Sequence, residues 1–157
     1  MAENYLSLLE EAKKHLKTAD HMIYITFPIL KENRLLIKIL EEICNSMLNT
    51  VNAVLQYESL MKRIKMYKDQ SMNFEIFRQK CAMRYNILPE QVNHIIEVLG
   101  IAEKHRQSPL EFSRRDRFFI MSDNLRLETV GIDKLKSFLI VGKDVLTKVS
   151  LSINKQF

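Results

Sequence analysis

The run from Ile43 to Tyr57 constrains the fold most, because its fifteen consecutive residues carry no charge. Apolar residues recur through this run and its flanks at intervals of three and four, which predicts one long helix from Asn33 to Ile64. The far side of this helix carries amides and hydroxyls, where a solvent-facing helix normally carries charges. We therefore expect a helix that other helices of the chain cover on most sides.

The composition favours a helical chain. The 157 residues are 46% hydrophobic and 27% charged, which is typical of a single globular domain. Three Gly and three Pro are few for an all-β chain, which needs many turns. The predicted fold class is all-α: an up-and-down bundle of four to five helices, with one small β-hairpin before the last helix, forming one domain over residues 1–157.

Four more segments have helical periodicity. The first runs from about Glu3 to Phe27 and ends or kinks at Pro28. Asn33 has the residue type of an N-cap for the long helix, and the short connection before it makes the first two helices antiparallel neighbours. The remaining helices are predicted over 73–85, 89–104 and 132–153.

Residues 104–131 differ in character from the rest of the chain. Pro109 excludes a continuous helix through them. Residues 118–122 and 125–130 are β-prone and flank Asp123-Asn124, a two-residue turn compatible with positive φ. We predict a hairpin here and no other β structure.

Cysteine content and charge patterning indicate a cytoplasmic protein. Cys44 and Cys81 do not make a disulfide framework, and Cys44 is predicted to be a buried, reduced thiol. The N-terminal residues are charged and periodic, unlike a signal peptide. The longest uncharged run is too short to span a bilayer, which needs about 20 apolar residues. We expect no membrane partner.

Motifs for catalysis are missing from the sequence. It has no Gly-rich phosphate loop and no His-Glu-x-x-His, Cys-x-x-Cys or Gly-x-Ser-x-Gly motif. His15 and His21 are six residues apart, which does not place two ligands on one helical face. We therefore predict no catalytic residue, no metal site and no cofactor.

Six basic residues around Pro109 form the one concentrated polar constellation: Lys104, His105, Arg106, Arg114, Arg115 and Arg117. Arginine suits phosphate because its planar fork donates two parallel hydrogen bonds. Residues 104–117 hold five Lys or Arg against two acids, a net charge of +3, and residues 62–84 hold seven against two, a net charge of +5. The six residues are predicted to bind RNA, a nucleotide or another polyanion.

The alternative is that Glu111 and Asp116 pair with neighbouring Arg residues and fix the loop. No interleaving of aromatic and basic residues marks a stacking platform for bases.

The order of elements resembles the HEPN superfamily of prokaryotic helical bundles: a long amphipathic helix, a long central helix, two shorter helices and a final long helix. The resemblance covers most of the chain and rests on this pattern. It implies a dimerising helical module that binds RNA or a nucleotide, or acts as the partner of a nucleotidyltransferase in a toxin–antitoxin system. HEPN ribonucleases carry an Arg followed four to six residues later by His. Neither His94 nor His105 has an Arg in that position, so the resemblance implies a non-catalytic or divergent member.

Two other functions stay open. A winged-helix DNA binder would use residues 74–85, 89–104 and 118–130 as helix, recognition helix and wing. The would-be recognition helix carries three acids that oppose phosphate: Glu90, Glu97 and Glu103. A divergent ribonuclease would use His105 as a general acid or base beside the Arg cluster.

The uncharged run also predicts association. An apolar face that the helices of one chain leave uncovered would become an interface between copies. We predict a homodimer, with Met47, Val51 or Val54 near the contact if the helix is not wholly internal. The alternative is a central helix sheathed entirely by its own chain.

Overall fold

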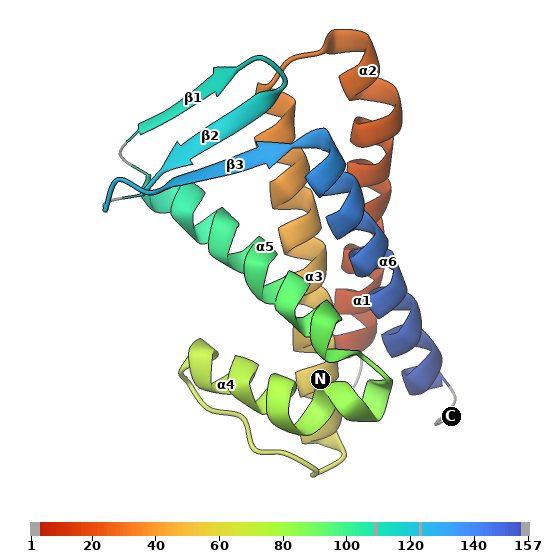
Figure 1. The fold of residues 1–157 in the computed structure, drawn as a ribbon. Helices are drawn as coiled ribbons and strands as arrows, with labels where there is room; N and C mark the ends of the chain where they lie inside the picture. Colours follow the sequence, from red (N-terminus) through yellow and green to blue (C-terminus); the bar gives the residue numbers. More distant parts are fainter. Residues whose placement is uncertain (1–3, 109, 123, 155–157) are drawn as a thin grey trace.

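The computed structural model describes residues 4–108, 110–122 and 124–154. It confirms a dominantly helical chain with a small antiparallel sheet before the last helix (Figure 1). The helical elements are α1 (Asn4–His21), the π-helix η1 (Met22–Thr26), α2 (Phe27–Leu30), α3 (Arg34–Leu60), α4 (Gln70–Ile76), the π-helix η2 (Phe77–Cys81), the 3₁₀-helix η3 (Ala82–Tyr85), α5 (Pro89–Gln107) and α6 (Ile132–Asn154). The strands are β1 (Leu110–Arg114), β2 (Arg117–Met121) and β3 (Leu127–Gly131).

Helices α1, α3, α5 and α6 form the predicted up-and-down bundle. α1 and α3 run antiparallel along their length, and α5 and α6 pack against α3 as well. The sheet lies at one end of the bundle, and α4 lies across the other end (Figure 1). In the described part of the chain, no helix has the length and apolar character needed to cross a membrane.

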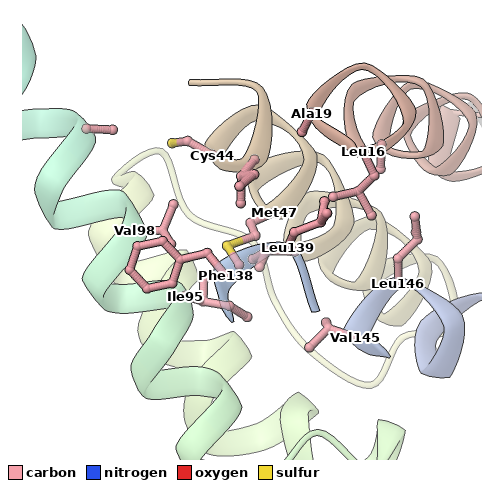
Figure 2. Packing of buried hydrophobic residues seen from close by; sticks show 14 of the residues in the cluster. Leu16, Ala19, Cys44, Met47, Ile95, Val98, Phe138, Leu139, Val145 and Leu146 are labelled. Carbon is pink, nitrogen blue, oxygen red and sulfur yellow. The ribbon is translucent and has the colours of Figure 1, made fainter. Parts of the chain in front are cut away.

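Helix α3 is the centre of the hydrophobic core. Fifteen of its 27 residues are buried. Figure 2 shows Met47 of α3 in the same interior region as Ile95 of α5 and Phe138 of α6. Gly142 allows α6 to approach closely, because a Cβ there would lie 3.2 Å from Leu16 of α1 and 3.9 Å from Met47.

This packing corrects the predicted dimer contact. Met47, Val51 and Val54 are only 2%, 3% and 0% exposed, and they belong to the core of a single chain. The helices packed around α3 cover them, so these three side chains are not on the surface of the folded protein. A homodimer stays a prediction, and it would have to use other residues.

The polar residues of α3 divide between the core and the surface. Ser46 Oγ donates to the carbonyl of Ala12 at 2.9 Å, and Thr50 Oγ1 donates to the carbonyl of Ser46 at 2.8 Å, so both buried hydroxyls are satisfied. Asn45 is exposed and Asn49 is half-buried. The uncharged far side of this helix is therefore partly open to solvent, which the sequence analysis does not predict.

α3 ends at Leu60, short of the predicted Ile64. Lys62 has a left-handed φ of 60° just beyond the helix. The N–H of Arg63 donates to the carbonyl of Glu58 at 3.0 Å, alongside a second bond from the N–H of Lys62. This pair of bonds is a Schellman motif, in which glycine usually holds the left-handed position. Because lysine holds it here, no residue type in the sequence marks the end of the helix.

The first helical segment also continues differently from the prediction. Its predicted start, Glu3, lies outside the described residues, and the chain stays helical through Pro28 to Leu30. Pro28 is in the first turn of α2, where its missing N–H is tolerated. Asn33 precedes α3 as predicted but makes no capping bond. Its side-chain amide instead donates to the carbonyl of Arg115 in the sheet.

The predicted helix Asn73–Tyr85 begins earlier, at Gln70, because Asp69 caps it. The Asp69 carboxylate accepts a hydrogen bond from the N–H of Ser71 at 3.0 Å. The segment then changes from the α-helix α4 to the π-helix η2 and finally to the 3₁₀-helix η3. It ends at Asn86, which has a left-handed φ of 60°, and Pro89 begins α5 as predicted.

The sheet has three strands in the order β1-β2-β3, so the prediction of a single hairpin is incomplete. β2 and β3 form that hairpin through a loop closed by the N–H of Ser122 and the carbonyl of Arg126 at 2.9 Å. Asp123 of the predicted turn lies outside the described residues. β1 pairs with β2 through a two-residue turn at Arg115-Asp116, where Arg115 has a φ of 56°. Such positions normally hold Gly, Asn or Asp, so the sequence does not reveal this turn.

A buried carboxylate joins the end of α3 to the end of η3. Glu58 has no exposed surface. It accepts hydrogen bonds from Arg63 at 2.7 Å, from Arg84, and from the Tyr85 hydroxyl at 3.1 Å. The side chains of Arg63 and Arg84 remain 34% and 46% exposed, so solvent offsets part of the cost of burying this ion cluster. Burial, and then the adjacent carboxylate, raise the pKa of the Tyr85 hydroxyl.

Replacing Glu58 with Gln should lower the free energy of unfolding by about 2 kcal/mol, because hydrogen bonds to charged groups contribute about 1.5–3 kcal/mol. Urea unfolding followed by circular dichroism measures the change. Glu97→Gln is the control, since Glu97 pairs with Lys134 at the surface and such pairs contribute about 0–1 kcal/mol. Equal losses in the two variants would show that the buried cluster has no special stabilising role.

Stability should also fall in alkaline solution. Burial of the Cys81 thiol, and then the nearby Glu58 carboxylate, raise the pKa of this thiol from 9.0 to about 11. The native state therefore favours the neutral thiol, and this contribution is complete below pH 9 and is lost as the pH rises from 9 to 11. The urea midpoint should be lower at about pH 10.5 than at about pH 8, and Cys81→Ala should reduce that difference. An identical pH dependence in the two proteins would contradict the prediction.

Candidate nucleic-acid interface

The three-stranded sheet has two faces of different character. Its register places alternate residues of the three strands on the same face. Phe118, Ile120 and Val130 are 8%, 0% and 0% exposed, and their face packs on α3, α5 and α6. We call the opposite face the exposed sheet face; its residues are exposed or half-buried, and they are Leu110, Phe112, Arg114, Arg117, Phe119, Met121, Leu127 and Thr129.

An aromatic pair lies at the centre of the exposed sheet face. Phe112 and Phe119 are cross-strand partners, and their rings stack with centroids 5.0 Å apart and an interplanar angle of 11°. Phe112 is 37% exposed. Arg114 and Arg117 are the next cross-strand pair on the same face, beside the turn. Aromatic rings and guanidinium groups therefore occupy neighbouring positions on one open surface.

The turn adds a third cation at the same end of the sheet. Arg115 is exposed, and its carbonyl accepts the hydrogen bond from the Asn33 side chain, which fixes the turn against the connection between α2 and α3. Within residues 4–108, 110–122 and 124–154, no carboxylate lies at ion-pair distance from Arg114, Arg115 or Arg117. The positive charge of this turn therefore faces solvent.

The basic residues at the end of α5 differ from those of the turn, because each of them pairs with a carboxylate. Nδ1 of His105 lies 2.5 Å from Oε2 of Glu111, and Nε2 lies 3.1 Å from Oε1 of Glu41. Nζ of Lys104 lies 3.7 Å from Oε2 of Glu128. Because Glu111 and Glu128 belong to the packed face of the sheet, these ion pairs attach the sheet to α5.

The structure therefore divides the six predicted residues into two groups at opposite ends of β1. Arg106, the third residue of the α5 group, pairs with Glu103 at 2.9 Å. Carboxylates hold the first group, which is Lys104, His105 and Arg106. The expected alternative paired Glu111 and Asp116 with Arg residues, whereas Glu111 pairs with His105. The turn group stays open to solvent, with Arg114 and Arg117 on the exposed sheet face and Arg115 in the turn between them.

The second basic stretch, residues 62–84, does not extend this surface. It lies around α4, at the end of the bundle away from the sheet (Figure 1). Arg63 and Arg84 bind the buried Glu58, and Arg78 pairs with Glu75 at 2.7 Å. The two stretches with the largest positive charge therefore form no common patch.

The arrangement around His105 does not suit acid–base catalysis, because both ring nitrogens face carboxylates. Cys44 lies nearby but is only 2% exposed. Burial raises the pKa of its thiol, with Arg106 acting in the opposite direction, so the thiol is neutral and buried as predicted. Among the described residues, no His, Cys, Asp and Glu side chains group in a way that could hold a metal ion.

The aromatic residues of the exposed sheet face are missed by the sequence analysis. Phe112 and Arg114 are two residues apart, as are Arg117 and Phe119, so aromatic and basic residues do alternate with the period of a strand. The signal becomes visible only when residues 110–114 are read as a strand. Read as a loop, these residues have no faces, so the shared face of Phe112 and Arg114 is not recognised.

Comparisons with protein-family models, with curated proteins and with solved structures found no match to the chain.

The two groups of basic residues should respond differently to mutation. His105→Ala should lower the free energy of unfolding by about 1–3 kcal/mol, because it leaves the half-buried Glu111 without its partner. Arg114→Ala should change it by less than about 0.5 kcal/mol, as is usual at an open surface position. Urea unfolding of both variants tests this difference, and a destabilised Arg114→Ala protein would show that the turn group is also structural.

Proposed function

We propose that the protein is a non-catalytic RNA-binding module that holds single-stranded RNA on the exposed sheet face. The observation that carries the proposal is the stacked pair Phe112 and Phe119 beside the unpaired guanidinium groups of Arg114 and Arg117. Phosphate oxygens suit the planar donor fork of arginine. Unpaired bases stack on aromatic faces. The exposed sheet face offers both groups on neighbouring residues of one rigid element.

A single strand fits this surface better than a duplex. Stacking on Phe112 needs a base that is not already stacked between its neighbours, as in loops and single-stranded segments of RNA. The aliphatic residues at the other end of the face, Leu110 and Leu127, are about half exposed and extend the apolar surface. The ligand would therefore place its bases along the strands and its phosphates toward the turn.

The alternatives have less support from the arrangement of charges. A winged-helix mode would place α5 in a DNA groove, but Glu90, Glu97 and Glu103 are exposed on that helix. A ribonuclease would need His105 to reach its substrate, and two carboxylates already engage its ring. Neither alternative has an observation that favours it over the exposed sheet face.

The remaining parts of the proposal rest on the HEPN resemblance. We propose that the module dimerises, and that a nucleotidyltransferase is its partner in a toxin–antitoxin pair. The supporting observations are the up-and-down bundle and the absence of catalytic geometry around His105. The two free, buried thiols support a reducing compartment, and we propose the cytoplasm.

Fluorescence anisotropy with a labelled single-stranded RNA tests the proposal. Phe112→Ala should weaken binding about 5- to 150-fold, because stacking contributes about 1–3 kcal/mol per base. The double variant Arg114→Ala/Arg117→Ala should reduce the slope of log K against log salt by about 1.4, since each phosphate contact on a single strand contributes about 0.7.

Lys68→Ala/Lys80→Ala is the matched control. It removes two exposed cations at the α4 end of the bundle and leaves the net charge equal to that of the arginine double variant. This control should bind RNA as the wild type does. Equal losses in both double variants would mean that net charge, and not the exposed sheet face, attracts RNA.

A further inference from the structure

The end of the bundle formed by η1 and α2 exposes a cluster of large apolar side chains. Tyr24 and Ile25 are each 50% exposed, Ile29 is 74% exposed and Leu30 is 57% exposed. These residues and the exposed Pro28 all fall within seven consecutive positions, and we call them the apolar tip. Figure 1 shows α2 at one extreme of the molecule, beside the turn between β1 and β2.

The fold does not require these residues to be apolar. The buried stripe of the first helical segment runs through Leu16, Ala19 and Ile23 at intervals of three and four. The exposed positions of the apolar tip lie off that stripe, where a surface helix normally carries charged or polar residues. Exposed apolar residues gathered in this way mark a binding surface.

Cations surround the apolar tip. Lys31 and Arg34 follow it directly in the chain. Nζ of Lys136 lies 5.4 Å from the ring centre of Tyr24, and the Asn33–Arg115 hydrogen bond brings the turn of the sheet to the same end. The connection after the tip, residues 31–34, has a net charge of +1, and the turn of the sheet, residues 114–117, has a net charge of +2.

We propose that the apolar tip inserts into the surface of a bilayer that contains anionic lipid. Aliphatic and tyrosine side chains enter the boundary between headgroups and acyl chains, while Lys and Arg remain at the anionic headgroups. Because the apolar tip lies at the end of the bundle, it can reach this boundary directly. A fluid bilayer also needs no surface shaped to match the tip. Because few residues insert, binding is reversible and weakens as salt rises.

A second copy of the chain fits this surface less well. A contact between two apolar tips would bring Lys31, Arg34 and Lys136 of each copy toward the same cations of the other. A stable interface also uses roughly 20–30 residues per side, far more than the tip provides. RNA fits less well too, because Ile25, Ile29 and Leu30 have no aromatic face for a base.

This inference differs from the sequence-based expectation of no membrane partner, which followed from the absence of a membrane-spanning run. Surface insertion needs only that a few apolar residues be exposed at one place, and the sequence does not show which residues those are. The inference does not depend on RNA binding, because the side chains that insert into lipid belong to residues 24–30 and not to the exposed sheet face.

The absence of Trp from the chain makes a direct test possible. The variant Ile29→Trp carries a single tryptophan in the apolar tip, and Met83→Trp is its matched control at a site in η3 that is 86% exposed. Vesicles of phosphatidylcholine with about 30% phosphatidylserine should shift the emission of Ile29→Trp to shorter wavelength and leave that of Met83→Trp unchanged. High salt should reverse most of the shift.

Co-sedimentation of unlabelled protein with the same vesicles is the second measurement. Ile29→Ser/Leu30→Ser should weaken partitioning at least about tenfold, because both side chains lose their apolar contact with lipid. Met83→Ser should leave it unchanged. Phe112→Ala should bind vesicles as the wild type does, so a failure of RNA binding can be told apart from a failure of this inference.

Three results would overturn the inference. The first is an Ile29→Trp emission that does not change with anionic vesicles even at low salt. The second is a blue shift without vesicles that grows with protein concentration, which would assign the apolar tip to contacts between copies. The third is a shift produced by single-stranded RNA instead of lipid, which would make the tip part of the nucleic-acid surface.

Discussion

The burial of α3 is the constraint on which the rest of the structure depends. Its apolar face is too wide for one partner helix, so α1, α5 and α6 all pack against it, and Gly142 lets α6 come close enough to fill the interior. One side of each of these helices is thereby buried in the core, while the outer side stays exposed. The sheet and the apolar tip lie at one end of the bundle, and the Glu58 cluster lies at the other.

The ion pairs on the packed face of the sheet explain how its charge is distributed. Glu111 pairs with His105 and Glu128 pairs with Lys104 at the end of α5. These two carboxylates are therefore not free to pair with the arginines of the turn. Beyond Glu111, β1 continues for three residues to Arg114, where it ends at the turn that also carries Arg115 and Arg117. A stretch that looks uniformly basic in the sequence thus becomes a neutral attachment at one end and an open positive turn at the other.

The sequence predicts the long helices well because their apolar periodicity extends over many turns, and it places Pro89 and the final helix correctly. It fails where a residue takes an unusual backbone conformation. Lys62 and Arg115 occupy left-handed positions that usually hold glycine or asparagine, so the end of α3 and the turn after β1 leave no trace in residue types. The missed strand conceals Phe112 from the predicted site. The sequence does not predict that Met47, Val51 and Val54 are buried within one chain, for another reason. Periodicity identifies an apolar face of a helix but not which element covers that face.

The two proposed surfaces meet at the turn of Arg115, since the Asn33 side chain holds this turn against the connection from the apolar tip to α3. RNA and an anionic bilayer are both polyanions, so each lowers the positive potential that attracts the other. If both surfaces are used, the coupling between them is therefore negative, and thermodynamic linkage makes it equal in both directions. Salt screening reduces the coupling along with the binding, because the Debye length is only about 8 Å at physiological salt. The turn with Arg114, Arg115 and Arg117 would then be the place where binding of one polyanion weakens binding of the other.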